Sequence, residues 1–260
     1  MSNEAVKLLP TKLRIGGFVD LSTVDWHKHL TFMIFTSGCP FRCLYCQNAS
    51  LIPMDSGQEV ELEFIKQRIE GNLGLIDAVG FSGGEPALQP KAVTEVLSWA
   101  KQIGLQTFLN TNGINPELIE RLIDGKLIDH IALSVVAPLR TEDYSRVMGR
   151  SEFAGKMVEN VKESIRVCLN SKVPFEVRTT IVPGLIDDER SVREIARAVK
   201  GCGVYVLQQY SPLGDILDPR FKKVEPPKRE LLIKLAKTAL REGIADVHIK
   251  TREYGEEEIA

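Results

Sequence analysis

Ser37-Gly-Cys-Pro-Phe-Arg-Cys-Leu-Tyr-Cys-Gln-Asn48 is the most informative stretch of this sequence. It places Cys39, Cys43 and Cys46 in the spacing C-x3-C-x2-C, and no fourth cysteine lies nearby. Three thiolates on one short loop can hold three corners of a cuboidal 4Fe–4S cluster. The fourth iron then has no protein ligand and is free to bind another molecule. The spacing therefore predicts a reactive cluster rather than a passive store of electrons.

Two other uses of clustered cysteines fit the sequence less well. A zinc knuckle usually needs four ligands, often arranged as two C-x-x-C pairs. His27 and His29 lie upstream, but a strand-like run separates them from the cysteines. Disulfides are not expected from three clustered thiols without a secretory signal. The context of the motif therefore favours a cluster over zinc.

Composition limits the class of protein. A chain of 260 residues can form one barrel-like domain with a large core. The net charge of -2 does not favour non-specific nucleic-acid binding, although a local basic groove and specific RNA binding stay open. No apolar run is long enough to span a membrane, and Met1–Pro10 lacks an apolar signal core. Free thiols and an exposed cluster suit a reducing, oxygen-poor cytoplasm.

Short apolar runs alternate with longer segments of helical period, which indicates βαβ units and a parallel sheet. The predicted strands are Leu30–Thr36, Ala78–Ser82, Gln106–Asn110, His130–Val135, Phe175–Val182 and Val204–Tyr210. The predicted helices are Glu61–Asn72, Pro90–Ile103, Pro116–Asp124, Ala154–Asn170, Ser191–Gly201 and Pro227–Glu242. This pattern predicts an α/β fold with an open, partial (βα)6 TIM-like barrel, whose chemistry gathers at the carboxyl ends of the strands.

We expect one domain over residues 1–260. Its core would span residues 13–215, followed by a loop and helix over residues 216–250. The acidic tail Glu253–Ala260 is expected to fray. Cys168 has helical spacing with apolar neighbours and is expected in the core, while Cys202 lies between two glycines in a turn.

The cysteine spacing, with the aromatic Tyr45 before the last cysteine, resembles the signature of the radical S-adenosylmethionine (radical SAM) superfamily. The flanks Gly17–Trp26 and Thr31–Cys39 are similar to the amino-terminal segment of the glycyl-radical-enzyme activating enzymes. That branch includes the activators of anaerobic ribonucleotide reductase and of pyruvate formate-lyase. The resemblance implies a 4Fe–4S cluster on the three cysteines, with S-adenosylmethionine on the fourth iron and Tyr45 close to both.

Gly83, Gly84 and Glu85 follow the second predicted strand. Glycines without side chains let a ligand approach the backbone. The resemblance assigns this Gly-Gly-Glu to the amino end of S-adenosylmethionine. The alternative is a glycine-rich turn with a solvated glutamate.

Asn110, Thr111 and Asn112 end the third predicted strand. Their donors and acceptors suit ribose hydroxyls or a substrate backbone, although a polar turn closed by Gly113 explains them as well. Activating enzymes often carry Asp at the place of Asn110. Ser134 ends the fourth strand and is a further candidate contact. Activating enzymes commonly show Asp-hydrophobic-Lys where this chain has Ser134-Val-Val136, which leaves the protein-activator assignment open.

Arg178 and Thr180 share one face of the fifth predicted strand. A charged arginine inside a barrel needs an anionic partner. The carboxylate of the cofactor or Glu85 would serve, and so would a structural acid such as Glu176. The resemblance also implies that Val182 packs on the adenine.

The resemblance implies the reaction. A one-electron donor such as ferredoxin or flavodoxin reduces the cluster, and S-adenosylmethionine is cleaved to methionine and a 5′-deoxyadenosyl radical that abstracts hydrogen. The first hypothesis is abstraction from a glycine of a partner enzyme, in particular anaerobic ribonucleotide reductase. The second is a radical SAM enzyme that modifies a small molecule or an RNA base. The third is a non-catalytic iron–sulfur or zinc protein.

Overall fold

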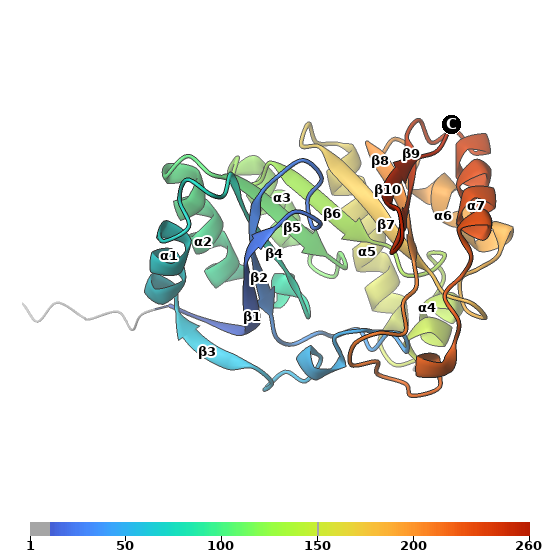
Figure 1. Cartoon of the computed structure of the whole chain (residues 1–260), viewed down its shortest axis with the longest axis horizontal. Helices are drawn as coiled ribbons and strands as arrows, with labels where there is room; N and C mark the ends of the chain where they lie inside the picture. Colours follow the sequence, from blue (N-terminus) through green and yellow to red (C-terminus); the bar gives the residue numbers. More distant parts are fainter. Residues whose placement is uncertain (1–10, 150) are drawn as a thin grey trace, which may run out of the picture.

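A computed structural model describes residues 11–149 and 151–260, and its ten strands form one sheet (Figure 1). The strand order is β10-β9-β8-β7-β6-β5-β4-β2-β1-β3. The strands are β1 (Lys12–Ser22), β2 (Thr31–Thr36), β3 (Gln58–Glu61), β4 (Ala78–Gly83), β5 (Gln106–Thr111), β6 (His130–Ser134), β7 (Phe175–Ile181), β8 (Val204–Gln209), β9 (Val247–Thr251) and β10 (Gly255–Glu258).

The central strands are parallel from β2 to β9, and β1, β3 and β10 add antiparallel edges. The six predicted strands correspond to β2, β4, β5, β6, β7 and β8, so the predicted parallel α/β sheet is confirmed. Strands covered on both faces read as continuous apolar runs, as Thr31–Thr36 does.

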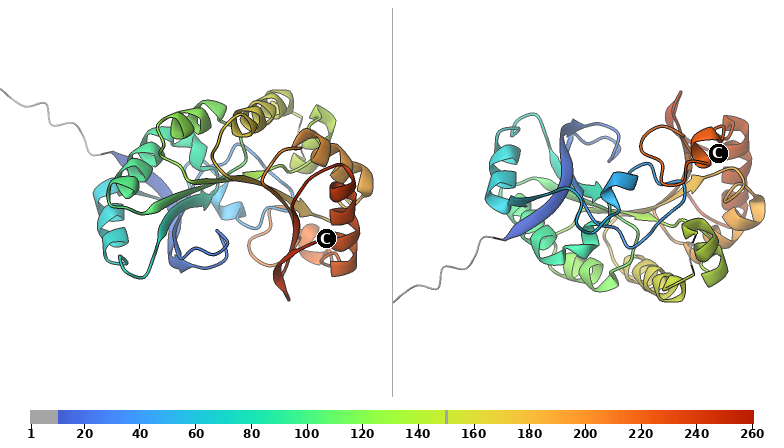
Figure 2. Two further views of the ribbon diagram at one scale, coloured as in Figure 1. Left: turned by 90° about the horizontal axis from the view of Figure 1, so that it is seen from above. Right: turned by 90° about the horizontal axis from the view of Figure 1, so that it is seen from below.

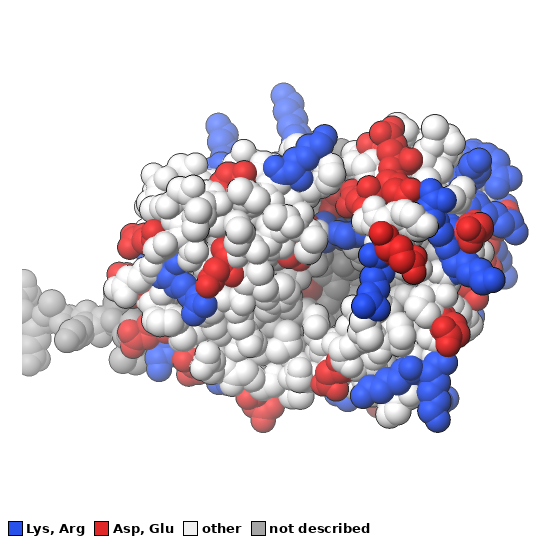
Figure 3. Space-filling view, in the orientation of Figure 1, with Lys and Arg blue, Asp and Glu red and all other residues white. Residues whose placement is uncertain are grey.

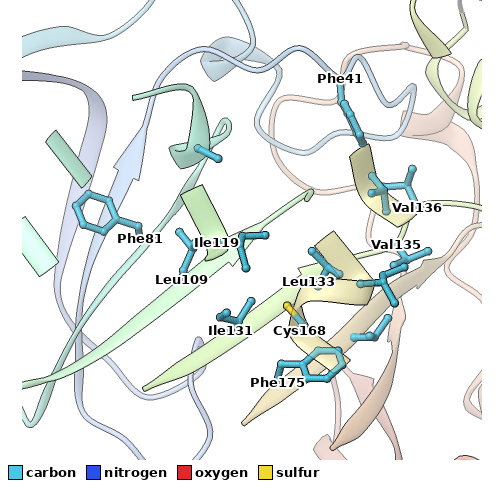
Figure 4. Packing of buried hydrophobic residues seen from close by; sticks show 14 of the residues in the cluster. Phe41, Phe81, Leu109, Ile119, Ile131, Leu133, Val135, Val136, Cys168 and Phe175 are labelled. Atoms are coloured by element: carbon cyan, nitrogen blue, oxygen red, sulfur yellow. The ribbon is translucent and has the colours of Figure 1, made fainter. Parts of the chain in front are cut away.

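Helices cover the convex side of the curved sheet, as both views of Figure 2 show. They are α1 (Leu62–Glu70), α2 (Pro90–Gln102), α3 (Pro116–Asp124), α4 (Thr141–Met148), α5 (Ala154–Leu169), α6 (Glu189–Ala198) and α7 (Arg229–Arg241). The core lies between these helices and the sheet. Figure 4 shows Leu109 and Ile131 beside Ile119 of α3, and Cys168 of α5 among the same buried residues, which confirms its core position.

The carboxyl-terminal segment differs from the sequence-based expectation. The prediction that Glu253–Ala260 frays is wrong, because β10 pairs with β9 in an antiparallel ladder. The acidic side chains find partners there: Arg229 forms an ion pair with Glu257 at 2.6 Å, and His248 contacts Glu256 at 2.8 Å. Charge alone predicted a solvated tail, whereas cross-strand pairing stabilises a strand.

Four further elements were missed by the sequence-based prediction: the edge strands β1 and β3, the short helix α4 and strand β9. In the described part of the chain, none of the helices combines the length and the apolar character that crossing a bilayer requires.

Candidate functional site

The cysteine loop follows β2 and lies across the carboxyl ends of the parallel strands. Cys39, Cys43 and Cys46 are free thiols. Backbone hydrogen bonds fix the loop: Cys39 N–H donates to Ile52 O at 3.1 Å, and Leu44 N–H donates to Val147 O at 3.0 Å. The three sulfur atoms are thus carried by a main chain that other elements hold in place.

A second segment, residues 214–218, runs along the cysteine loop, and we call it the strap. Leu217 N–H donates to Cys46 O at 3.1 Å, and Asp215 N–H donates to Gln47 O at 3.1 Å. In return Ala49 N–H donates to Asp215 O at 2.9 Å. The conformation of the metal-binding loop therefore depends on hydrogen bonds with a segment that is far away in sequence.

The loop and the strand ends enclose a cavity of about 480 Å³. All three cysteines line it, which brings the predicted metal ligands to one space. The predicted cofactor contacts Tyr45, Gly83, Gly84, Glu85, Asn110, Thr111, Asn112 and Ser134 line it as well. Figure 3 shows a hollow on this face, with basic and acidic side chains intermixed on the side of β9 and β10 and largely uncharged side chains on the side of β1.

The thiols are poor acids in this setting. Burial raises the pKa of Cys39 well above its ordinary value, and Glu85 and Cys43 raise it further. Burial also raises the pKa of Cys43 and of Cys46. A bound cation reverses this preference, because thiolate ligation releases the proton. Within residues 11–149 and 151–260, no three His, Cys, Asp or Glu side chains are arranged around a single metal ion. A cluster differs from such an ion because each thiolate binds an iron of its own.

The two glycines of the Gly-Gly-Glu turn are required by close backbone packing. A Cβ on Gly84 would lie 2.4 Å from Gly38 O, and one on Gly83 would lie 2.5 Å from Thr36 N. Gly83 also has φ +108, which favours glycine. Their missing side chains therefore let β4 and the cysteine loop approach each other.

Glu85 is buried rather than solvated, with 1% of its surface exposed. Its carboxylate accepts hydrogen bonds from Thr111 Oγ1 at 2.6 Å, from Asn112 N–H at 2.7 Å and from Ala87 N–H at 2.9 Å. Burial raises the pKa of Glu85 to about 7, and the hydrogen bonds oppose the shift. The alternative of a solvated glutamate is thus wrong: the carboxylate joins the ends of β4 and β5.

Two asparagines, Asn110 at the end of β5 and Asn112 in the loop after it, line the cavity. Asn112 Nδ2 lies 3.7 Å from Cys39 Sγ, so it can donate to the sulfur. Hydrogen bonds to cluster thiolates shift the reduction potential. Asn110 Nδ2 donates to Ser82 Oγ at 3.0 Å, and Ser134 Oγ donates to Asn110 Oδ1 at 3.4 Å. These three polar side chains line the cavity floor across β4, β5 and β6.

Arg178 and Val182 do not line this cavity. Arg178 forms an ion pair with Glu176 and donates to Asp25 O at 2.7 Å, so the structural acid named as the alternative is its partner. Burial alone would raise the pKa of Glu176, but His130 and Arg178 lower it to about 2. Val182 is fully buried and its N–H donates to Ile186 O at 2.9 Å. The structure therefore gives no support to a cofactor contact at either residue.

Sequence reasoning missed the cavity wall formed by β9. Lys250, Thr251 and Arg252 line the cavity beside Gln208 and Gln209 of β8. The sequence of β9 does alternate as a strand should. Val247, Ile249 and Thr251 are buried, while His248 and Lys250 are partly exposed. The segment is short and follows a long helix, so it was not predicted as a strand.

A half-open parallel barrel with three cysteines above its strand ends defines an enzyme class that works through an iron–sulfur cluster. The family model described as the Radical SAM superfamily matches residues 33–199, and the chain belongs to that superfamily. Enzymes of this superfamily use a 4Fe–4S cluster and S-adenosylmethionine.

Two relatives are similar over most of their length. A protein of Methanocaldococcus jannaschii, whose name proposes it as a glycyl-radical enzyme activating enzyme, is 37% identical over 240 residues, which are 92% of this chain and 97% of that protein. The pyruvate formate-lyase 1-activating enzyme of Escherichia coli is 26% identical over 84% of this chain and 92% of its own. The fold is similar to that of TYW1 with a lysine-pyruvate adduct bound, with a TM-score of 0.61 and 18% identity over 86% of this chain and 77% of that one.

Proposed function

We propose that this enzyme activates a glycyl-radical enzyme by abstracting a hydrogen atom from a glycine of that partner, with anaerobic ribonucleotide reductase as the first candidate. The observation that carries the proposal is the shared cavity: three thiols on one loop face the polar ends of β4, β5 and β6. The relatives named as activating enzymes support the same reaction class.

The residues of the cavity would divide the task. Cys39, Cys43 and Cys46 would hold the cluster, and the polar groups at the ends of β4 to β6 would hold S-adenosylmethionine. When bound, the cluster and this cofactor supply the radical chemistry, and the protein positions the reactants and excludes water. Asn112 would donate to the sulfur of Cys39, while Glu85 holds the loop of Asn112 in place.

The cell must supply the electron and the partner. An acidic carrier such as ferredoxin or flavodoxin would reduce the cluster, and a reducing cytoplasm would protect it. Both are part of this proposal.

The experiment is anaerobic reconstitution with iron and sulfide, followed by reduction and addition of S-adenosylmethionine. We expect 5′-deoxyadenosine, and with a candidate partner we expect the doublet of a glycyl radical by electron paramagnetic resonance. Formation of 5′-deoxyadenosine without a glycyl radical on any candidate partner would contradict activation but leave radical chemistry intact. Absence of both would contradict the whole proposal.

A second candidate function is modification of a small molecule. It is favoured by the uncharged Ser134-Val-Val136 at the end of β6 and by Lys250 and Arg252, which suit a small anion. Product analysis by mass spectrometry after incubation with metabolite extracts separates this function from the first, since only a small-molecule enzyme would change a metabolite other than S-adenosylmethionine and its cleavage products.

A further inference from the structure

More positively than negatively charged side chains line the cavity. Its charged lining residues are Glu85, Lys250 and Arg252. Glu85 turns its carboxylate to Thr111 and Asn112 and is 1% exposed, so it presents little negative charge to a ligand. Lys250 of β9 and Arg252 of the turn after it therefore supply the positive charge of the lining, while acidic side chains also border the hollow in Figure 3.

Lys250 is held in place by a main-chain carbonyl and forms a long ion pair with Glu256. Its Nζ donates to Val24 O at 2.6 Å, and the nearest carboxylate oxygen, from Glu256, lies 3.9 Å away. Burial lowers the pKa of Lys250 and the guanidinium of Arg178 lowers it further, while the carboxylates of Glu256, Glu176 and Asp25 oppose the shift. An ammonium group next to a second cation is stabilised by any anion that enters the cavity.

Arg252 is placed by its backbone and left free at its side chain. Its N–H donates to Gln209 Oε1 at 3.0 Å, and Gln209 in turn donates to Pro227 O at 2.9 Å. Among the residues that the structure describes, none forms a hydrogen bond or ion pair with the guanidinium of Arg252. Many other arginines do have such a partner, as Arg229 has in Glu257.

We propose that Lys250 and Arg252 form a carboxylate-binding subsite for the molecule that gives up the hydrogen atom. Its occupant would be an acidic side chain on the polypeptide segment that carries the reacting glycine, so this source rests on the proposed function. A guanidinium binds a carboxylate through two parallel hydrogen bonds, which gives orientation as well as affinity.

The position of the subsite favours the substrate over the cofactor. The predicted contacts to S-adenosylmethionine lie on β4, β5 and β6, whereas Lys250 and Arg252 belong to β9 and the turn after it. Strands β7 and β8 separate the two groups in the sheet. One cavity can thus hold the cofactor at one end and an acidic substrate at the other.

The test measures binding to the full-length, cluster-reconstituted protein with S-adenosylmethionine present. The probes are fluorescein-labelled synthetic peptides with one central glycine and a single Asp at each flanking position in turn, each matched by an Asn peptide. We expect one Asp peptide to bind at least about tenfold more tightly than its Asn counterpart, with the preference falling as salt rises. R252Q and, independently, K250Q should abolish the preference.

R121Q is the matched control. Arg121 lies on α3, away from this cavity, and also lacks an ion pair within the described residues. Its substitution should leave the preference unchanged. A second arm measures benzoate against benzamide by their effect on the midpoint of thermal unfolding, which tests a free carboxylic acid.

The outcomes of these binding experiments support or overturn the carboxylate-binding subsite as follows. A wild-type protein without acid preference in either arm, or variants R252Q and K250Q that keep it, would overturn the subsite. A parallel loss of affinity for S-adenosylmethionine in R252Q would make the subsite part of cofactor binding and overturn it too. Binding of benzoate alone, dependent on Arg252, would support the subsite and contradict its polypeptide source. Failure of the proposed function is seen separately, as a missing glycyl radical with the wild-type protein.

Discussion

Thr111 Oγ1 donates a hydrogen bond of 2.6 Å to Glu85 Oε1, and both side chains are buried. The second carboxylate oxygen accepts from Asn112 N–H at 2.7 Å. The same asparagine reaches Cys39 Sγ with its amide at 3.7 Å. The Gly-Gly-Glu turn is thus connected to the cysteine loop through the loop after β5. The buried carboxylate of Glu85 makes this connection.

Replacing Glu85 with alanine should destabilise the protein. It leaves the donors of Thr111, Asn112 and Ala87 buried without an acceptor, at a cost of about 1–3 kcal/mol for each in the free energy of unfolding. Urea unfolding of the apoprotein measures this. E225A is the control, because Glu225 is exposed. Equal stability of E85A and wild type would show that the carboxylate does not join the two loops.

The same carboxyl should make stability depend on pH. Its pKa is about 7 in the folded protein and about 4.5 when unfolded, so the folded state binds more protons between these values. The free energy of unfolding should therefore fall as pH rises from 4.5 to 7, by up to about 3 kcal/mol in the limit. E85Q lacks this group, and its stability should fall less over that range. Parallel curves for the two proteins, measured by urea unfolding from pH 5 to pH 8, would contradict the assignment.

The central sheet could be predicted well because each of its strands is a contiguous apolar run in the sequence. Runs such as Thr31–Thr36 are buried on both faces and are read directly as strands. The cysteine spacing and the Gly-Gly-Glu turn are also contiguous, so their meeting at one edge follows from parallel strands. The strap and the wall of β9 could not be predicted in this way. Their residues depend on partners far away in sequence, as Lys250 does on Val24.

Arg178 illustrates the limit of strand alternation. Its side was predicted correctly, but its partner was left open among three anions, and only the structure shows Glu176. Alternation determines on which face of the sheet a side chain lies. It does not determine which of the acidic groups on that face pairs with the arginine. Burial of Glu85 against Thr111 was equally invisible, because no local pattern distinguishes it from a solvated turn residue.

Substitution of any one of the three loop cysteines by serine should abolish the cluster. C39S, C43S and C46S each remove one of three ligands, and no fourth cysteine lies nearby to replace it. After anaerobic reconstitution we expect iron and sulfide contents to fall to a small fraction of wild type, with no formation of 5′-deoxyadenosine. C168A is the control, since Cys168 is a buried core residue, and it should keep its cluster. A full cluster in C43S would contradict the assignment of the ligands.

R178Q should weaken the fold more than it weakens the binding of S-adenosylmethionine. It leaves the buried Glu176 with His130 in place of the guanidinium, and breaking a buried ion pair by removing one partner typically costs about 3–5 kcal/mol. The pKa of Glu176 is lowered to about 2, so its contribution is present above about pH 4.5 and is lost as pH falls toward 2. Urea unfolding at pH 7 and pH 3 should show a larger difference between wild type and R178Q at pH 7. The double variant E176Q/R178M should recover part of the stability, and a selective loss of cofactor affinity in R178Q would instead indicate a direct contact.

Gly214 and Gly184 form a matched pair that tests the strap. Both have positive φ, +93 and +80, so alanine costs about 1 kcal/mol of backbone strain at each. They differ in their surroundings, because a Cβ on Gly214 would lie 2.9 Å from Gln47 O while Gly184 has no atom within 4 Å. G214A should therefore displace the cysteine loop and lower cluster content and the rate of 5′-deoxyadenosine formation several-fold beyond G184A. Iron analysis and single-turnover assays of the two variants side by side measure this, and identical losses would mean that the strap does not position the cysteines.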